Sequence, residues 1–281
     1  MNAFRPFSLN IQGKLHEFDR PLVMGILNVT PDSFYAGSRT SDKDDIKARV
    51  RNMLNEGVDI IDIGAYSSRP GADDVSKEEE IARIAKGMAV IREMAPDIIV
   101  SVDTFRADVA QVAIETFGAD IINDISGGDL DDNMWHTAAR LRVPYILMHM
   151  RGNPTTMQSM TDYNDVTADV VYDLSVKLRQ LRLAGIADVI VDPGFGFSKT
   201  TEQNFEMMRN LDVITESLDA PLLVGISRKS MITKPLGIDA SDALAGTVAL
   251  NTIALMRGAS IIRVHDVSEA VAALKMYQLS N

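Results

Sequence analysis

The stretch Met24-Gly-Ile-Leu-Asn-Val-Thr-Pro-Asp-Ser-Phe34 joins an apolar run to a polar loop. The run covers residues 22–27 and stops at Asn28, after which Asp32 and Phe34 follow with no helical spacing. A short, continuous apolar run is typical of a strand that is buried on both faces. We therefore predict a buried strand that delivers polar side chains to the loop at its carboxyl end.

Seven further apolar runs repeat this pattern and alternate with longer amphipathic segments. Together the eight predicted strands cover residues 22–27, 59–63, 98–102, 120–123, 144–148, 188–191, 222–226 and 260–264. Right-handed crossovers between eight such units close most simply into a (β/α)₈ TIM barrel, of the α/β class. A doubly wound open sheet is the alternative.

The connections from a predicted helix to the next strand share one feature. Four of them begin with glycine, at Gly57, Gly118, Gly185 and Gly258. Glycine adopts positive φ at little cost just past a helix end, so it can turn the chain directly into the next strand. The repetition indicates one repeated βα unit, and no linker interrupts it. We predict a single domain over residues 1–281, in which a β-hairpin (1–20) plugs one end of the barrel (21–281).

Two predicted helices begin with the spacing of a capping box, Ser76 with Glu79 and Thr200 with Gln203. The acidic run 78–80 is expected to be a solvent-exposed first turn, favoured by the helix dipole.

The composition is that of an ordinary globular protein, with 46% hydrophobic and 24% charged residues among 281. The net charge of −11 repels nucleic acid and anionic membranes, so neither is expected as a partner, and a polyanionic ligand needs a local basic pocket. The absence of cysteine excludes disulfides and thiolate chemistry. Residues 1–10 lack an apolar signal core, and we expect a soluble, cytoplasmic protein.

The polar residues at the ends of the predicted strands form a coherent set, because parallel strands of a barrel end on one face. In chain order they include Asn28, Asp62, Asp103, Asn123, His149, Asp192, Lys229, Arg263 and His265.

These residues suggest two kinds of contact. Asp103, Asn123 and Asp192 suit a flat, nitrogen-rich heterocycle, since a buried carboxylate pairs with adjacent N–H groups. A second group of amides, hydroxyls and cations could hold a polyanion; its members are Asn28, Ser68, Arg69, Arg263 and His265. Lys229 could contribute to both. A heterocycle that carries a phosphate tail fits this arrangement.

Structural roles compete with these interpretations. An aspartate at a strand end is often a cap or turn former, and we expect Asp124 and Asp266 to be caps. His149 is more often a satisfied structural histidine than a ligand. Gly194-Phe-Gly196 lacks the third glycine of a dinucleotide fingerprint, so it indicates no such cofactor.

Eight short motifs together resemble the dihydropteroate synthase family, the sulfonamide target of folate biosynthesis. They are Asn28-Val-Thr-Pro-Asp-Ser-Phe34, Arg69-Pro-Gly71, Ser101-Val-Asp-Thr104, Ile122-Asn-Asp-Ile125, His149-Met-Arg-Gly-Asn-Pro154, Asp192-Pro-Gly-Phe-Gly-Phe197, Ser227-Arg-Lys-Ser230 and Arg263-Val-His-Asp266. The resemblance implies condensation of 6-hydroxymethyl-7,8-dihydropterin pyrophosphate with 4-aminobenzoate, to give 7,8-dihydropteroate and pyrophosphate. It also implies Mg²⁺ and a homodimer.

The resemblance further implies a role for each matching residue. The pterin-binding set is Asp103, Asn123, Asp192 and Lys229, and the pyrophosphate set is Ser68, Arg69, Arg263 and His265. Asn28 is the implied Mg²⁺ contact, and the aminobenzoate wall comprises Phe197, Lys229 and Ser230, with Phe34 and Pro70 nearby. The residues implied in catalysis are Asp103, Lys229 and Arg69. The sequence departs from the family pattern in two places. In the second loop Ala65-Tyr66 replace Gly-Glu and Ser68 replaces the usual threonine, and after Phe34 the pair Tyr35-Ala36 replaces the usual small and acidic residues.

Two other functions compete with this one. Pterin-binding methyltransferases share the acidic and amide groups, but they have no use for a polyanion site. A non-catalytic barrel that binds a pterin as a sensor belongs to a different class. Pyrophosphate release that requires both 4-aminobenzoate and Mg²⁺ separates the three.

Overall fold

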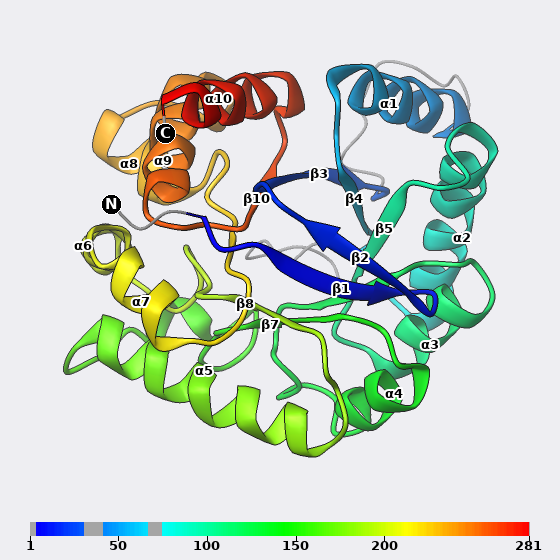
Figure 1. Cartoon of the computed structure of the whole chain (residues 1–281), viewed down its shortest axis with the longest axis horizontal. Coiled ribbons are helices and arrows are strands. Elements are labelled where there is room, and N and C mark those ends of the chain that lie inside the picture. The colour runs from blue at the N-terminus through cyan, green and yellow to red at the C-terminus, as the bar shows by residue number, and fades with distance from the viewer. Residues whose placement is uncertain (1–3, 31–41, 67–74, 281) are drawn as a thin grey trace.

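The computed structural model describes residues 4–30, 42–66 and 75–280 (Figure 1). The strands are β1 (Phe7–Ile11), β2 (Lys14–Phe18), β3 (Leu22–Asn28), β4 (Ile60–Gly64), β5 (Ile99–Asp103), β6 (Ile121–Asp124), β7 (Tyr145–Met148), β8 (Val189–Asp192), β9 (Leu223–Val224) and β10 (Ile261–Val264). The α-helices are α1 (Asp42–Glu56), α2 (Lys77–Met94), α3 (Ala107–Glu115), α4 (Met134–Leu141), α5 (Val166–Leu183), α6 (Thr201–Arg209), α7 (Leu211–Ser217), α8 (Ser230–Leu236), α9 (Leu244–Met256) and α10 (Val267–Ser280).

Strands β3 to β10 form one parallel sheet in the order β8-β7-β6-β5-β4-β3-β10-β9. A bridge between Val191 and Leu222 connects the two ends of this sheet, and Val191 N–H donates to the Pro221 carbonyl at 2.9 Å. The strands therefore form a ring with helices around it, as Figure 1 shows. All eight predicted strands are present and the TIM barrel is confirmed, whereas the open-sheet alternative is wrong.

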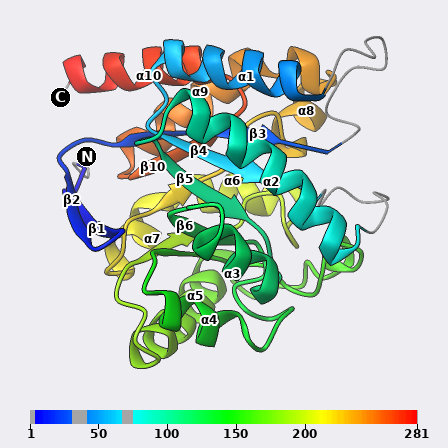
Figure 2. The same ribbon diagram turned by 90° about the vertical axis from the view of Figure 1, so that its right-hand side faces the viewer.

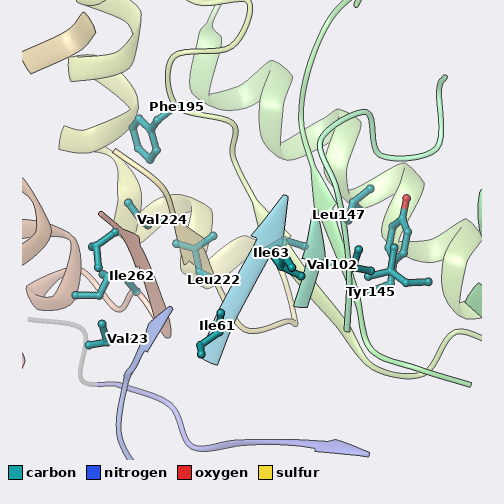
Figure 3. Close-up of a cluster of buried hydrophobic side chains, with 14 of the residues drawn as sticks. Val23, Ile61, Ile63, Val102, Tyr145, Leu147, Phe195, Leu222, Val224 and Ile262 are labelled. Carbon is teal, nitrogen blue, oxygen red and sulfur yellow. The ribbon is translucent and has the colours of Figure 1, made fainter. Parts of the chain in front are cut away.

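The outer faces of the strands pack against the helices. Ile61 and Ile63 of β4, with Val102 of β5, are fully buried in this layer (Figure 3). Side chains alternate between the two faces of a strand, so the intervening residues point into the barrel. Because both faces are buried, the strands read as continuous apolar runs in the sequence.

The lower part of the barrel interior is apolar. Its buried residues, which lie in the first half of the strands and pack together, are Leu22, Met24, Ile60, Ile121, Ile146, Ile190, Leu223 and Ile261. Leu9 and Ile11 of the β1–β2 hairpin join this cluster, and Figure 2 shows the hairpin beside the start of β3. The hairpin therefore closes the end of the barrel where the strands begin, as the sequence predicted.

Two groups of helix-end predictions are confirmed, and one is only partly correct. The four glycines have φ between 72° and 94°, and Thr200 and Gln203 form the predicted capping box. Ser76 accepts from Glu79 N–H, but the Glu79 carboxylate binds Arg83 instead of completing a box. Among the described helices, none combines the length and the apolar character needed to span a membrane.

Candidate active site

Along four strands, the side chain that faces the barrel interior is apolar at one position and polar two residues later. Ile60 is followed by Asp62, Ile121 by Asn123, Ile190 by Asp192 and Ile261 by Arg263. Each second residue lies nearer the carboxyl end of its strand, so the polar groups collect at one rim of the barrel.

Asp62 lies at the centre of this rim and was not among the predicted binding residues. Its side chain is fully buried and accepts from Arg263 Nε at 2.6 Å. A second guanidinium nitrogen of Arg263 donates to Asp103 at 2.6 Å, and the Asn123 amide donates to Asp62 at 3.2 Å. One arginine therefore bridges two carboxylates, while an amide fixes the deeper of them.

Burial changes the acid–base properties of this network. Desolvation raises the pKa of Asp103 to about 7, although the nearby Arg263 cation opposes the change. Desolvation disfavours the charged form of Arg263 too, but Asp62 and Asp103 outweigh it and the pKa is raised. The rim therefore carries a permanent cation beside a carboxylate that titrates near neutral pH.

Asp192 lies across the rim from Asp62, at the end of β8. Its carboxylate accepts from Gly194 N–H at 2.7 Å, and burial raises its pKa against the opposing charge of Lys229. A Cβ on Gly225 would lie 3.8 Å from Asp192 Oδ2, 3.9 Å from Arg263 Cβ and 4.0 Å from Lys229 Nζ. Residues from β8, β10 and the segment after β9 therefore converge around a glycine that leaves them room.

Lys229 connects the rim with the loop after β8. Its ammonium donates to the Phe195 carbonyl at 2.6 Å and lies 4.6 Å from the centre of the Phe197 ring. Desolvation lowers its pKa to about 8, while Asp192 favours the charged form. Arg228, which precedes it with φ 57°, binds Asp266 through two nitrogens. Asp266 is thus an ion-pair partner of Arg228, which differs from its predicted role as a cap.

His265 lies at the end of β10, where Ser227 Oγ is 3.1 Å from its Nδ1. The same hydroxyl oxygen accepts from the His265 backbone N–H at 3.2 Å. Burial and the Arg263 cation lower the imidazole pKa to about 4, so the ring is neutral at physiological pH. A neutral imidazole can contribute a hydrogen bond to an anion, but no charge.

Asn28 ends β3 on the same side of the rim as Asp103. A Cβ on Gly64 would lie 3.7 Å from Asn28 Oδ1 and 3.6 Å from Asp103 Oδ2. The described residues include no cluster of three or more His, Asp or Glu side chains arranged around a metal. Mg²⁺ is usually held by few protein oxygens, together with water and substrate phosphate, so the Asn28 amide oxygen could contribute one ligand at this end of the barrel.

A small apolar cluster that no sequence motif indicates borders the polar groups. Its buried members are Ile125, Met148, Met150 and Met157, with Phe105 and Phe197 packed against them. Apolar side chains next to a few convergent polar groups are typical of a pocket for a flat organic ligand.

The remaining predicted residues have different outcomes. Asp124 is a loop cap as predicted, because its carboxylate accepts from Ser126 and Gly128 N–H. Glu80 is not solvated: it is fully buried, accepts from Thr104 Oγ1 at 2.7 Å and pairs with Arg106. Ser230 is exposed at the start of α8. The predicted residues Phe34, Ser68, Arg69 and Pro70 lie outside the described residues.

The sequence is similar to known pterin-binding enzymes over nearly its whole length. Residues 24–265 match the family described as pterin binding enzyme. The chain is 45% identical to the dihydropteroate synthase of Clostridium beijerinckii, over 92% of this chain and 93% of the relative. It is 41% identical to the synthase of Escherichia coli, over 95% and 94%. It spans about half the length of some curated relatives, such as an Arabidopsis thaliana folate synthesis bifunctional protein, of which it covers 55% at 45% identity.

Solved structures agree with the sequence relatives. The synthase of Xanthomonas albilineans with 4-aminobenzoic acid superposes with a TM-score of 0.89 at 37% identity, covering 97% of both chains. The same enzyme with 7,8-dihydropteroate gives a TM-score of 0.86 at 35% identity, covering 97% and 98%. This chain belongs to the dihydropteroate synthase family of pterin-binding enzymes.

Proposed function

We propose that this protein condenses 6-hydroxymethyl-7,8-dihydropterin pyrophosphate with 4-aminobenzoate, releasing pyrophosphate and forming 7,8-dihydropteroate. The observation that supports this most is the rim itself, where Arg263 donates to both Asp62 and Asp103, and the Asn123 amide donates to Asp62. Acids suit the N–H groups of a pterin, whereas cations suit its pyrophosphate. A methyltransferase would need the first set without the second.

The reaction proceeds in two steps. The bond between the pterin methylene carbon and the pyrophosphate oxygen breaks first, and pyrophosphate keeps the electron pair. The aniline nitrogen then forms a bond with the methylene carbon and loses a proton. No side-chain nucleophile is needed, so the protein works by positioning and by electrostatic stabilisation.

The charged residues have complementary tasks in these steps. Ionised Asp103 stabilises the cation that develops on the pterin, and Asp192 and Asn123 hold the ring. Lys229 would contact both the pterin and 4-aminobenzoate, which the 4.6 Å between its ammonium and the centre of the Phe197 ring supports. Arg263, with Arg69, Ser68 and His265, binds the leaving pyrophosphate. Bound Mg²⁺ would offset charge on that group, and Asn28 is the residue that would hold the ion.

Domain organisation, assembly and location complete this proposal. We infer that residues 1–281 act as one domain, because Leu9 and Ile11 of the hairpin are part of the lower barrel core. A homodimer is the expected assembly. The cytoplasmic location stays a prediction from the sequence.

An assay of pyrophosphate release tests the function. Release should require the pterin pyrophosphate, 4-aminobenzoate and Mg²⁺ together, and the product should be 7,8-dihydropteroate by mass. Methyl transfer without pyrophosphate release would instead assign the methyltransferase function. Tight pterin binding without turnover would assign the sensor function.

A further inference from the structure

Lys199 is a buried lysine for which the proposed reaction has no direct use. It lies between the end of β8 and α6, and only 4% of the residue is exposed to solvent. Its ammonium lies 3.0 Å from each of three acceptors, namely the Gly194 carbonyl, the Phe197 carbonyl and His149 Nδ1. Desolvation lowers the Lys199 pKa to about 7, while Asp192 favours the charged form. The protonated amine has three donors, so these three contacts satisfy it fully.

The acceptors of Lys199 are themselves well defined. Burial lowers the pKa of His149 to about 4, so its ring is neutral, and Nδ1 can accept while Nε2 lies 3.3 Å from Asp173. Gly194 has φ 70°, and a Cβ there would approach the His149 carbonyl oxygen to less than 2 Å. The loop is therefore packed directly on the backbone of His149, and Lys199 completes this contact from the interior.

Two expected binding residues depend on the backbone that Lys199 holds. Gly194, whose carbonyl accepts from Lys199, donates its own N–H to the Asp192 carboxylate at 2.7 Å. Phe197, whose carbonyl also accepts from Lys199, places its ring 4.6 Å from Lys229 Nζ. One buried ammonium thus supports an acid assigned to the pterin and an aromatic ring assigned to 4-aminobenzoate.

The arrangement of Lys199 parallels that of Lys229. Each lysine follows a non-glycine residue in the left-handed region, Ser198 at 48° and Arg228 at 57°. Left-handed backbone is unfavourable for such residues and persists only where the surroundings enforce it. Lys229 binds the Phe195 carbonyl, so the two ammonium groups together hold three carbonyls of one four-residue stretch.

We propose that Lys199 is a positioning residue, which fixes the loop after β8 so that the pterin and aminobenzoate subsites keep their productive separation. This inference rests on the proposed synthase reaction. A displacement of about 1 Å between reacting groups can reduce a rate by about 100-fold, so even a small loop movement should be measurable.

The test compares Lys199→Met with Lys177→Met in the full-length protein. Lys177 is a matched control, because it also supports a loop carbonyl, that of Gly127, and pairs with Asp129 outside the proposed site. In Lys199→Met we expect kcat to fall about tenfold or more and KM to rise about tenfold for both substrates. In Lys177→Met both parameters should stay within about twofold of the parent.

The KM values separate positioning from mere support of folding. A purely structural role would reduce the folded fraction, and so lower the apparent kcat without changing either KM. If Lys199→Met does not fold, Lys199→Gln replaces it, since the amide keeps two donors but no charge. We expect the Gln variant to raise both KM values between twofold and tenfold, and unchanged KM values in a folded variant would overturn the inference.

Calorimetric titration with the pterin pyrophosphate and 4-aminobenzoate gives a readout without turnover. Weaker binding of both by the Lys199 variant, but not by the Lys177 variant, supports the inference. An inactive parent protein would overturn the proposed function. The two binding affinities would still show whether Lys199 positions the loop. An active parent with unaltered Lys199 variants would overturn this inference alone.

Discussion

The two ends of the barrel each contain an arginine paired with a buried carboxylate, but the two pairs have different surroundings. We call the end where the strands begin the floor of the barrel. There Arg92 binds Asp120 at 2.9 Å and also donates to the backbone carbonyls of Ile98 and Gly118. Asp120 accepts as well from Val100 N–H and from Gln12 of the hairpin. Its charge is therefore surrounded by fixed donors of the fold.

The rim pair is less completely enclosed. Arg263 bridges Asp62 and Asp103, and the Asp103 side chain is 22% exposed, compared with 3% for Asp120. Desolvation raises the pKa of Asp103 to about 7, whereas several fixed donors surround the floor carboxylate. The comparison indicates that the arginine–aspartate pair at the floor stabilises the fold, because protein donors surround its carboxylate. The arginine–aspartate pairs at the rim are suited to ligand binding, because the Asp103 carboxylate is partly exposed.

The largest expected effect comes from removing the rim cation. Arg263→Met leaves Asp62 and Asp103 in the interior without their shared partner, and turnover should fall at least about 100-fold, because the same cation is assigned to the leaving group. Unfolding free energy should fall by about 3–5 kcal/mol, as expected when one partner of a buried pair is lost. Turnover and urea denaturation measure the two effects.

The floor arginine provides the matched control. Arg92→Met also breaks a buried pair, so it should lower the unfolding free energy by a comparable amount. Its KM values and its turnover per folded molecule should stay near those of the parent. If Arg92→Met impairs turnover as much as Arg263→Met, the functional distinction between the two ends is wrong.

The second effect concerns pH and tests the titration of Asp103. A carboxyl group whose pKa is raised to about 7 is protonated below that pH, so kcat/KM for the pterin substrate should fall about tenfold per unit as the medium becomes more acidic. It should also decline above about 8, where Lys229 loses its proton. The pH profile of kcat/KM measures both limbs.

Asp103→Asn isolates the acidic limb of that profile. The amide keeps the shape of the side chain but cannot titrate, so the residual activity should be lower and should no longer depend on pH between 6 and 7. A parent profile that is flat between pH 6 and 8, or an Asn variant with an unchanged acidic limb, would contradict the assigned role.

The sequence predicted the floor and the positions of the rim residues better than the contacts among them. The eight strands were readable because both faces are buried, so each strand is a continuous apolar run. The central role of Asp62 was not readable, since its partner Arg263 lies 201 residues away. Glu80 looked like a solvated first turn because the residues that bury it, Thr104 and Arg106, come from the next βα unit.

Lys199 illustrates the same limit at close range. A lysine just before a helix cap is usually solvent-exposed, and no periodic pattern marks this one. Ser198, at φ 48°, precedes Lys199, and the ammonium meets carbonyls two and five residues earlier in the chain. Backbone conformation and loop closure decide this contact, and residue type alone carries no signal for either.

The smallest expected effect on activity comes from the floor, and it tests whether the two ends are independent. Leu9 is 1% exposed within the lower core, so Leu9→Ala removes buried methyl groups and should lower the unfolding free energy by about 2–4 kcal/mol. Leu15→Ala, on the same hairpin but 67% exposed, should change it by no more than about 0.5 kcal/mol. Urea denaturation measures both.

Kinetic constants of these hairpin variants decide the question of independence. The polar residues of the rim lie only two positions after the apolar residues of the floor. A cavity left by Leu9→Ala could therefore shift the strands and displace Asp62 or Asp192. We expect it not to, since strand pairing around the ring fixes the backbone between the two layers. A KM change above about fivefold in Leu9→Ala would show that floor packing sets the rim geometry, and the hairpin would then be part of the binding apparatus as well as a plug.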